Sequence, residues 1–507
     1  MLGVLVSELC ERMTEADIKF EREMRDPIYG YIFLTNFEND VLDSEIFQRL
    51  DRIFQMPTAQ LVYPSAKHTR KTHSLGAMHL SHRAILHILY LQSEEKQKKI
   101  SPLCWGEQVV TKEKEEGLQS FDQKLRAKWW NDRKQEKIIQ SLRLAAMLHD
   151  IGHAPFSHLF EDVCKHSKIK LAFKGKKRIF DHEIMSMKII EEKESELGIK
   201  SPFSSSDINE ILKKRGKAPR FLHELVSGAY DCDKLDYLAR DAYATGAIEF
   251  GGIDCERIMD GLRVVKENLC VSLSALDALM ESFDAVQYMY TSVYYHKTAR
   301  VFDFMIDDAL TKIPDFLTEI VSDIDKFLEM DDYCFLSEAK KYAEVNPSNE
   351  HREVIKTIDD FRHRHKKYKD IYSHRVSIDL LIRRETEKSL KNVERELKKE
   401  AKNLDIRVDF RPRIRPVGIG IEELRAWMMT EKIYDSNDGK LKTLEDVCAA
   451  YHRRLTQYLI LFRVYANREQ LDDDPNGTFN SERKRIVEVA KEMLCEIEKE
   501  YRSLRTK

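Results

Sequence analysis

Residues 145–158 read AAMLHDIGHAPFSH, and this stretch places metal-binding side chains at the end of an apolar helix. The run from Leu142 to Leu148 has the periodicity of a buried helix face and leads directly into His149 and Asp150. Buried polar side chains need a partner, and a metal ion would satisfy both of these at once. A hydrogen-bonded structural couple would also satisfy them, so a metal site requires further ligands.

Glycine and proline interrupt the helix directly after this pair. Gly152 and Pro155 break the helix, and His153 and His158 follow His149 within nine residues. Several imidazoles and a carboxylate therefore converge on one short bend. Nitrogen and oxygen ligands without sulfur suit a hard or borderline divalent cation.

An isolated histidine upstream is the first candidate for a further ligand. In KHTRKTHSLG, at 67–76, a polar loop that contains Arg70 leads to His73. An apolar helix then follows, and we expect it to begin near Leu75 and to run to residue 91. The histidine would thus stand where a loop enters the core.

An acidic helix downstream, DCDKLDYLARD at 231–241, supplies the second candidate. Asp233, Tyr237 and Asp241 recur there at i, i+4 and i+8, so they share one helix face, and Lys234 lies beside them. Four protein ligands leave open coordination positions for water and substrate, as a catalytic metal requires. The candidate metal ligands are His73, His149, Asp150 and Asp233.

With these residues the chain resembles the HD-domain metal-dependent phosphohydrolases. Within that family it is most similar to the deoxynucleoside triphosphate (dNTP) triphosphohydrolases, which include bacterial dGTP triphosphohydrolases and the vertebrate sterile-alpha-motif/HD-domain enzyme. The resemblance covers residues 25–310 and follows the family's order through seven segments. They are RDPIYGYI (from Arg25), FQRLDRIFQM (from Phe47), HTRKTHSLG (from His68), LHDIGHAPFSHLFED (from Leu148), DHE (from Asp181), DCDKLDYLARD (from Asp231) and VYYHK (from Val293).

The resemblance also implies how the phosphates are handled. His182 would be the proton donor, oriented by Glu161, a position where relatives commonly have Asp. A histidine beside a carboxylate stays protonated to a higher pH, which suits a general acid. Near the metal, residues placed to handle the phosphate charge are Arg70, Lys234, His153 and His158. The cofactor would be a divalent ion, with Mn, Mg, Fe, Zn and Ni not distinguished.

Further matches with the family concern the sugar and the base. Gln55 and Asp241 would hydrogen-bond the 3′-hydroxyl, and Tyr237 would stack so that a 2′-hydroxyl does not fit. Tyr294 matches a tyrosine near the base. Tyrosines at helical spacing are usually core residues, so a packing role is the alternative for both. The implied reaction is attack of a metal-bound water on the α-phosphorus, which releases deoxynucleoside and triphosphate.

The chain departs from the family at several nucleotide contacts. An arginine that contacts triphosphate in some relatives falls on Val286. Asp43 and Gln48 match positions that read an activating guanine nucleotide in the vertebrate enzyme, but the partner arginine falls on Asp51. We therefore do not expect that kind of activation. Residues 296–297 (His-Lys) still offer contacts to an effector nucleotide at a subunit interface, since relatives are homo-oligomers.

Two other classes of function stay open alongside a dNTP triphosphohydrolase. One is an HD phosphohydrolase acting on monophosphates, cyclic dinucleotides or alarmones. The other is a nucleotide- or nucleic-acid-binding HD protein with little catalysis, which would use the charged insertion at 93–137 and the basic segment RPRIR at 411–415. Turnover of ribonucleotides without turnover of dNTPs would favour the first class. Salt-sensitive oligonucleotide binding would favour the second.

Composition places the chain among soluble proteins of the cytoplasm, with the nucleus left open. Its 507 residues are 42% hydrophobic and 34% charged, and the net charge of -3 gives no global attraction to nucleic acid or acidic membranes. The nine cysteines show no C-x-x-C spacing, which favours reduced thiols. We find no signal peptide and no apolar run long enough to cross a membrane.

The expected fold is mainly α, an HD-domain helical core with a small C-terminal α+β lobe. We place the core at 1–317, with a charged insertion at 93–137, a helical extension at 318–404 and the lobe at 405–507. Within these bounds we expect helices at 1–24, 43–62, 221–243, 273–317, 350–368 and 385–403, a hairpin at 29–34, a basic loop at 173–178, a polar linker at 205–219, and strands at 406–410 and 458–465.

Overall fold

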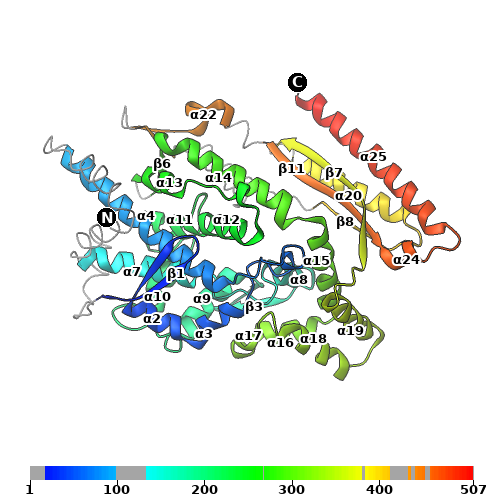
Figure 1. The fold of residues 1–507 in the computed structure, drawn as a ribbon, viewed down its shortest axis with the longest axis horizontal. Helices are drawn as coiled ribbons and strands as arrows, with labels where there is room; N and C mark the ends of the chain where they lie inside the picture. Colours follow the sequence, from blue (N-terminus) through cyan, green and yellow to red (C-terminus); the bar gives the residue numbers. More distant parts are fainter. Residues whose placement is uncertain are drawn as a thin grey trace.

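The computed structural model describes residues 18–98, 133–265, 268–379, 383–410, 432–435, 440–451 and 457–505. Most of the charged insertion at 93–137, the basic segment at 411–415 and the first seventeen residues lie outside this part of the chain. The described part is mainly helical, as expected, and a small lobe with its own sheet lies at the carboxyl-terminal end (Figure 1).

A hairpin opens the described chain where a helix was predicted. β1 (Phe20–Asp26) pairs antiparallel with β2 (Gly30–Thr35). The hairpin expected at 29–34 is wrong in its bounds, because this segment is a single strand whose partner is the segment before it. The helix predicted for 1–24 is therefore wrong over β1. Asp26 fixes the turn, because its carboxylate accepts the N–H groups of Ile28 and Tyr29 at 2.8 and 3.1 Å.

Short helices then follow instead of one helix at 43–62. Ser44 caps a new helix by accepting the N–H of Phe47 at 3.2 Å, which breaks the run. These elements are α2 (Asn36–Asp43), α3 (Glu45–Gln48), η1 (Arg49–Arg52) and η2 (Ala59–Leu61).

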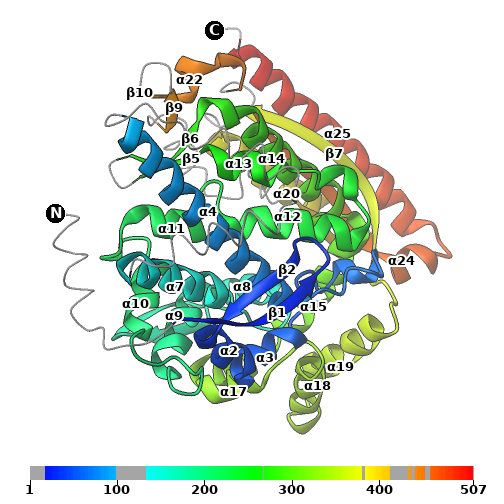
Figure 2. The same ribbon diagram turned by 60° about the vertical axis from the view of Figure 1, so that its left-hand side comes forward.

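Three helices form the centre of the core. α4 (Arg70–Lys98) packs against both α7 (Arg133–Leu148) and α12 (Cys232–Thr245). Figure 2 shows α4 and α12 in the middle of the core. The carboxyl end of α7 meets the amino ends of α4 and α12, because His149 and His73 both lie close to Asp233. α4 begins at Arg70, earlier than the predicted start near Leu75, and therefore carries His73 in its first turn.

The helices around this centre correct two more predictions. The expected linker at 205–219 contains α10, whose N-cap Ser204 accepts the N–H of Asp207 at 3.3 Å and which buries Ile208 and Ile211. The expected basic loop at 173–178 is the tip of a hairpin. The elements are α8 (His158–His166), β3 (Lys170–Phe173), β4 (Lys176–Ile179), α9 (His182–Glu192), α10 (Ser205–Leu212) and α11 (Arg220–Val226).

A second set of elements covers the other side of α12. The predicted helix at 273–317 is divided by a π-helical turn, η5, which holds Tyr294. Such turns are frequent at functional sites. The elements are η3 (Ile248–Phe250), α13 (Cys255–Gly261), β5 (Leu262–Val265), β6 (Asn268–Ser272), η4 (Leu273–Ala275), α14 (Leu276–Met289), η5 (Tyr290–Tyr294) and α15 (Lys297–Leu310).

A helical extension follows and packs back on the core. α19 is amphipathic, because it buries Val354, Ile358 and Phe361 on one face. The elements are α16 (Pro314–Ser322), α17 (Ile324–Glu329), α18 (Phe335–Val345) and α19 (Asn349–Arg362).

The lobe has a three-stranded sheet of order β7-β11-β8. Its strands are β7 (Tyr368–Asp379), β8 (Ile406–Asp409) and β11 (Gln457–Asn467), and its helices are α20 (Arg383–Glu400), α24 (Arg468–Asp472) and α25 (Thr478–Arg505). Both strands predicted here are present, and β7 is a further strand that was not predicted; it begins at Tyr368, the last residue of the helix predicted at 350–368. α20 and α25 lie together on one side of the sheet (Figures 1 and 2). α20 buries Leu390, Val393 and Leu397 in the apolar core of the lobe.

The opposite face of the lobe sheet rests on α15. Arg300 donates to Asp409 on β8 at 2.9 Å, and Tyr465 packs edge-to-face on Phe304 with 5.2 Å between ring centroids. Between β8 and β11 the chain returns to the core. There β9 (Ile433–Asp435) pairs parallel with β6 and antiparallel with β10 (Lys440–Lys442). α22 (Leu444–Val447) follows β10. None of the described helices is long and apolar enough to cross a membrane.

Candidate metal centre and active site

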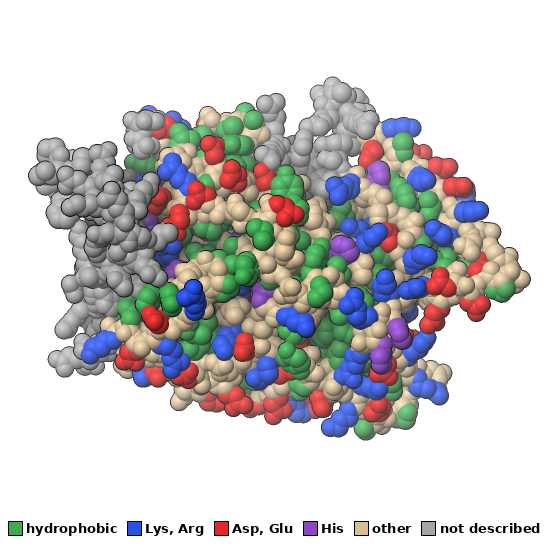
Figure 3. All heavy atoms as spheres, viewed as in Figure 1, with side chains coloured by type: hydrophobic (Ala, Val, Ile, Leu, Met, Phe, Trp, Pro, Cys, Tyr) green, Lys and Arg blue, Asp and Glu red, His purple; other side chains and the backbone are tan. Residues whose placement is uncertain are grey.

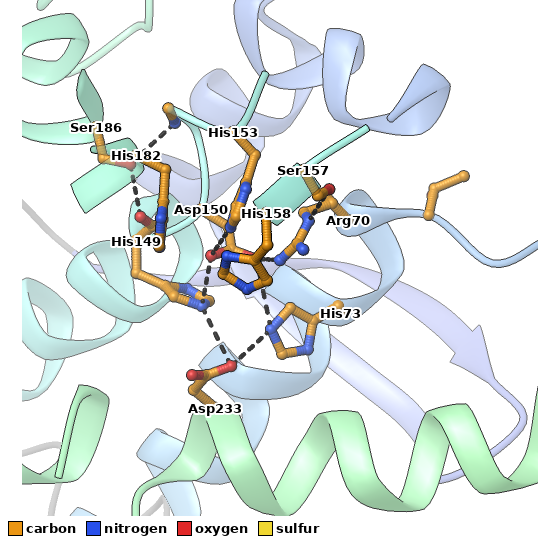
Figure 4. Close-up of polar contacts among 12 residues, drawn as sticks. Arg70, His73, His149, Asp150, His153, Ser157, His158, His182, Ser186 and Asp233 are labelled. Atoms are coloured by element: carbon orange, nitrogen blue, oxygen red, sulfur yellow. Dashed lines mark hydrogen bonds and ion pairs between the residues drawn. The ribbon is translucent and has the colours of Figure 1, made fainter. Parts of the chain in front are cut away.

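Four predicted ligands meet where α4, α7 and α12 converge (Figure 4). His73 Nε2 lies 2.9 Å from Asp233 Oδ1 and 3.6 Å from Asp150 Oδ2. His149 Nε2 lies 3.2 Å from Asp150 Oδ1 and 3.6 Å from Asp233 Oδ1. Two imidazole nitrogens and two carboxylates thus surround one point, although they come from three separate segments.

The outer nitrogens of these two imidazoles are already bonded. His73 Nδ1 lies 2.8 Å from Asp236 Oδ2, and His149 Nδ1 donates to the carbonyl of Ala146 at 2.7 Å. The inner Nε2 atoms are buried and face the carboxylates of Asp150 and Asp233. Metal-binding histidines show this arrangement, with one nitrogen held by the protein and the other aimed at the ion. The donors therefore fit a divalent cation.

Electrostatics in this group also favours a cation. Burial alone would lower the pKa of His73, but the bonds to Asp233 and Asp236 outweigh it and raise that pKa to about 10. Burial would raise the pKa of Asp150, but His149 and Arg70 hold it well below its usual range. The carboxylates therefore stay ionised and hold positive charge at the imidazoles, which a metal ion would supply in place of protons.

A tight turn presents His149 and His153 to the same side. Phe156 and Ser157 adopt positive φ of 62° and 50°, which is uncommon outside glycine. At Gly152 a Cβ would lie 2.2 Å from the backbone nitrogen of Ser186, so α9 can approach only a glycine there. Ser186 Oγ accepts the Gly152 N–H at 2.9 Å and donates to the His149 carbonyl at 2.6 Å.

A second group of imidazoles lies beside the first. His153 stacks on His182 with 4.0 Å between ring centroids, and His158 meets both rings edge-on. His182 Nδ1 is paired with Glu161, and His153 Nε2 lies 3.3 Å from Asp150 Oδ1. The four predicted catalytic residues, His153, His158, Glu161 and His182, are therefore brought together next to the predicted metal ligands, and their own donor atoms also lie within 4.8 Å of one another.

The two stacked imidazoles carry different charges. Burial works against a charged His182, but the Glu161 carboxylate outweighs it and raises the pKa of His182 to about 9. Burial, the Arg70 charge and the His182 charge together place the pKa of His153 well below its usual range. At neutral pH, His182 is protonated and His153 is neutral.

Arg70 and Lys234, the two cationic side chains predicted to bind phosphate, both have hydrogen-bond partners within the chain. Arg70 donates to Asp150 Oδ2 at 2.6 Å and to Ser157 Oγ at 3.1 Å, so it lies against the metal ligands. Lys234 instead donates to Asp231 at 2.5 Å and to the carbonyl of Gly228 at 2.9 Å. Asp231 caps α12, so the structure places this lysine at the helix end and not among the metal donors.

The predicted sugar contacts gather on the α12 side of the metal ligands. Asp241 accepts from His68 Nε2 at 2.6 Å and from the Tyr294 hydroxyl at 2.7 Å. Tyr237 lies between, with its ring centroid 6.5 Å from that of His73 and 6.4 Å from that of Tyr294. The backbone of Gln55 joins this group, because its N–H donates to the His68 carbonyl at 3.1 Å.

The residues matched to an activating nucleotide have partners inside the chain. Arg22 holds the Asp43 carboxylate with two bonds of 2.8 Å. Gln48 donates to the Leu42 carbonyl at 2.6 Å and accepts from Lys71 at 2.9 Å. His296 caps α15 and accepts the N–H of residue 298 at 3.3 Å. Val286, where some relatives have an arginine, is buried in an apolar cluster.

Sequence reasoning missed two aspartates near the site. Asp236 contacts His73 and lies within the DCDKLDYLARD segment, three residues after Asp233, so its place on the helix was a usable signal. Asp332 accepts the N–H groups of Phe54 and Phe156 at 2.6 and 2.7 Å and so joins the loops on either side of Arg70. No local sequence pattern predicts this long-range contact.

Comparison with known proteins agrees with this geometry. A model of the HD domain matches residues 124–241, and a model of an HD associated region matches residues 253–411. The deoxynucleoside triphosphate triphosphohydrolase SAMHD1 homolog of Dictyostelium discoideum is 29% identical over 351 residues, which are 67% of this chain and 59% of that protein. Human deoxynucleoside triphosphate triphosphohydrolase SAMHD1 is 24% identical over 386 residues, 69% of this chain and 55% of that protein.

Less characterised relatives share the same region. An uncharacterised protein of Methanocaldococcus jannaschii is 30% identical over 318 residues, 62% of this chain and 54% of that protein. A hypothetical protein from Aquifex aeolicus has the same fold, with a TM-score of 0.61 and 24% identity over 90% of this chain and 98% of that chain. This chain spans less than two thirds of the length of the curated relatives named above. The two matching models show that the chain contains an HD domain followed by an HD associated region.

Proposed function

We propose that the chain is a metal-dependent dNTP triphosphohydrolase, which converts a dNTP and water into deoxynucleoside and triphosphate. One observation carries the proposal. A continuous row of contacts runs from the predicted catalytic histidines, through the predicted metal ligands, to the residues predicted to contact the sugar. The row is His182, His153, Asp150, His73, Tyr237, Tyr294 and Asp241. Its order matches a nucleotide whose phosphates lie at the imidazoles and whose sugar lies at the tyrosines.

The phosphate end of this row divides the work between charge and protons. A divalent ion held by His73, His149, Asp150 and Asp233 would bind phosphoryl oxygens and acidify a water. His182, protonated at neutral pH, would give its proton to the leaving 5′-oxygen, and Glu161 would keep the ring oriented. Neutral His153 would hydrogen-bond a phosphoryl oxygen, while Arg70 would share its charge between Asp150 and the phosphates.

The sugar end supports a choice of deoxyribose. The Asp241 carboxylate is buried, and its bonds to His68 and Tyr294 hold it in place to accept a bond from a 3′-hydroxyl. The side-chain Oε1 of Gln55 is buried and has no hydrogen-bond partner among the described residues, so the Gln55 amide is available to the sugar. The ring of Tyr237, beside His73, would occupy the space that a 2′-hydroxyl needs.

Product analysis tests this proposal. Purified protein is incubated with each dNTP and NTP and with Mn²⁺ or Mg²⁺, with effector nucleotides added in a parallel series, and the products are separated by ion-pair chromatography. We expect deoxynucleoside and triphosphate from dNTPs, and none from the double variant His149→Ala/Asp150→Ala. In H₂¹⁸O, the label should appear in triphosphate, because water attacks the α-phosphorus.

Other products would redirect the assignment. Turnover of monophosphates, cyclic dinucleotides or alarmones without dNTP turnover would make the chain a different HD phosphohydrolase. No turnover at all, together with oligonucleotide binding, would favour a binding protein; on the face drawn in Figure 3, however, basic and acidic side chains are interspersed. The proposal includes a homo-oligomer and an effector nucleotide, but not reading of guanine by Asp43, whose carboxylate Arg22 already holds.

A further inference from the structure

One of the two imidazoles at the candidate metal centre is held by a charged partner and the other by a neutral one. His73 Nδ1 lies 2.8 Å from the carboxylate of Asp236, and both side chains are wholly buried. His149 Nδ1 bonds the backbone carbonyl of Ala146 at 2.7 Å. Because a carboxylate only accepts hydrogen bonds, Nδ1 of His73 must carry the proton.

The Asp236 carboxylate is itself fixed from the opposite side. Arg240 donates to its two oxygens, each at 2.9 Å, in a fork geometry that leaves the carboxylate no freedom to rotate. A third nitrogen of Arg240 reaches Asp26, at the turn of the first hairpin, at 2.8 Å. The hairpin therefore supports α12, and α12 supports the histidine of α4.

α4 has a glycine at the point where the Asp236 carboxylate packs against it. Gly76 lies one turn after His73, and a Cβ at this position would lie 1.8 Å from Asp236 Oδ1 and 2.4 Å from Arg240 Nη2. Glycine inside a helix costs about 1 kcal/mol relative to alanine. A glycine at this point of α4 is therefore explained by the room that the ion pair needs.

We propose that Asp236 is a positioning residue that holds His73 with its Nδ1 protonated and its Nε2 lone pair directed at the metal. The proposal rests on the function proposed above, because it requires that the cluster binds a divalent cation. A negatively charged partner also makes the ring a stronger donor. His73 is then the stronger of the two nitrogen ligands, and Asp236, Arg240 and Gly76 form the support that sets metal affinity.

The test is the affinity of the full-length protein for Co²⁺, measured by calorimetry after chelation and followed by the Co²⁺ absorption spectrum. Asp236→Asn keeps the shape of the side chain and removes its charge. We expect its Co²⁺ dissociation constant to rise about 10- to 100-fold, the range known for such outer partners. Gly76→Ala changes no charge, but it displaces the carboxylate and should weaken Co²⁺ binding in the same direction.

Glu38→Gln is the matched control. Glu38 is an equally buried carboxylate that accepts from Arg143 and from Gln140 at 2.6 and 2.7 Å, and it touches none of the four metal ligands. Its substitution should lower stability and leave Co²⁺ affinity unchanged. Circular dichroism shows whether each variant is folded; if Asp236→Asn is not, Gly76→Ala carries the comparison.

The outcomes separate this inference from the proposed function. If the unaltered protein binds no divalent ion, the metal centre itself is refuted. If it binds Co²⁺ and folded Asp236→Asn binds equally well with the same spectrum, the metal centre stands and the positioning role is wrong. If Glu38→Gln weakens binding as much as Asp236→Asn does, the effect is one of stability, and the positioning role is again wrong.

Discussion

Two groups of imidazoles share one carboxylate, Asp150, yet they differ in what they are built to hold. In the first group, His73 and His149 bond outward through Nδ1, and their Nε2 atoms face carboxylates. In the second, His182 is paired with Glu161, and neutral His153 stacks against it. His73 and His182 both have a carboxylate at Nδ1, so the groups differ in what surrounds the rest of the ring. Nε2 of His73 faces the carboxylates of Asp233 and Asp150, whereas His182 stacks on the neutral ring of His153.

The largest effect should follow from removing a member of the first group. His149→Ala should lower kcat/KM by about 10⁴-fold or more, because the bound metal supplies both charge stabilisation and an acidified water. The metal content of the purified variant, measured by mass spectrometry, should fall with the activity. Full metal content with lost activity would contradict the role of His149 as a ligand.

Removing the proton donor of the second group should have a smaller effect. His182→Ala should lower kcat by about 10²- to 10⁴-fold, the usual contribution of a general acid. Its metal content should equal that of the unaltered protein, whereas His149→Ala should lose metal. Loss of metal from this variant would mean that His182 belongs to the metal site.

The pH dependence of kcat should separate the groups further. The Glu161 carboxylate raises the pKa of His182 to about 9, so activity should fall as pH rises through that value and the proton is lost. Glu161→Gln removes the charge, so the alkaline limb should move toward 6.5, the ordinary pKa of histidine. An alkaline limb that stays in place would contradict the pairing.

The same ion pair predicts a trend in stability. Because the folded-state pKa of His182 is raised, its contribution is fully present below the ordinary value near 6.5 and is lost as pH rises through about 9. Thermal unfolding of Glu161→Gln should therefore depend less on pH in that window than unfolding of the unaltered protein. An equal dependence in both proteins would assign the stability to other groups.

The smallest effect is expected at Asp332, which touches neither group directly. It joins the loops of Phe54 and Phe156, and Asp332→Ala would leave two backbone N–H groups without their acceptor. The loss of stability should be about 1–3 kcal/mol, as for other unsatisfied buried donors. Chemical denaturation measures this loss, and we expect metal content to be unchanged.

Much of the site could be predicted because its residues sit in local patterns. His149 and Asp150 end an apolar helix, and Asp233 lies on a regular helix face, so both positions follow from periodicity. Lys234 was predicted to bind phosphate, and the structure shows it bonded to the cap Asp231, three residues earlier; its phosphate role stays a prediction. A charged residue beside a ligand has two local uses, and spacing alone does not choose between them.

The parts of the fold that were missed depend on distant pairing. β1 and β7 are charged segments that look helical or irregular alone, and they become strands only because β2 and β11 pair with them. The contact of Asp332 with Phe156 spans 176 positions in the chain. Neither kind of information is present in a short window of sequence.

Anomalous scattering from a crystal soaked in Mn²⁺ tests the difference between the two groups most directly. We predict one strong peak in the chain, bounded by His73, His149, Asp150 and Asp233. A peak among His153, His158, Glu161 and His182 with none at the first group, or no peak at either, would contradict the account.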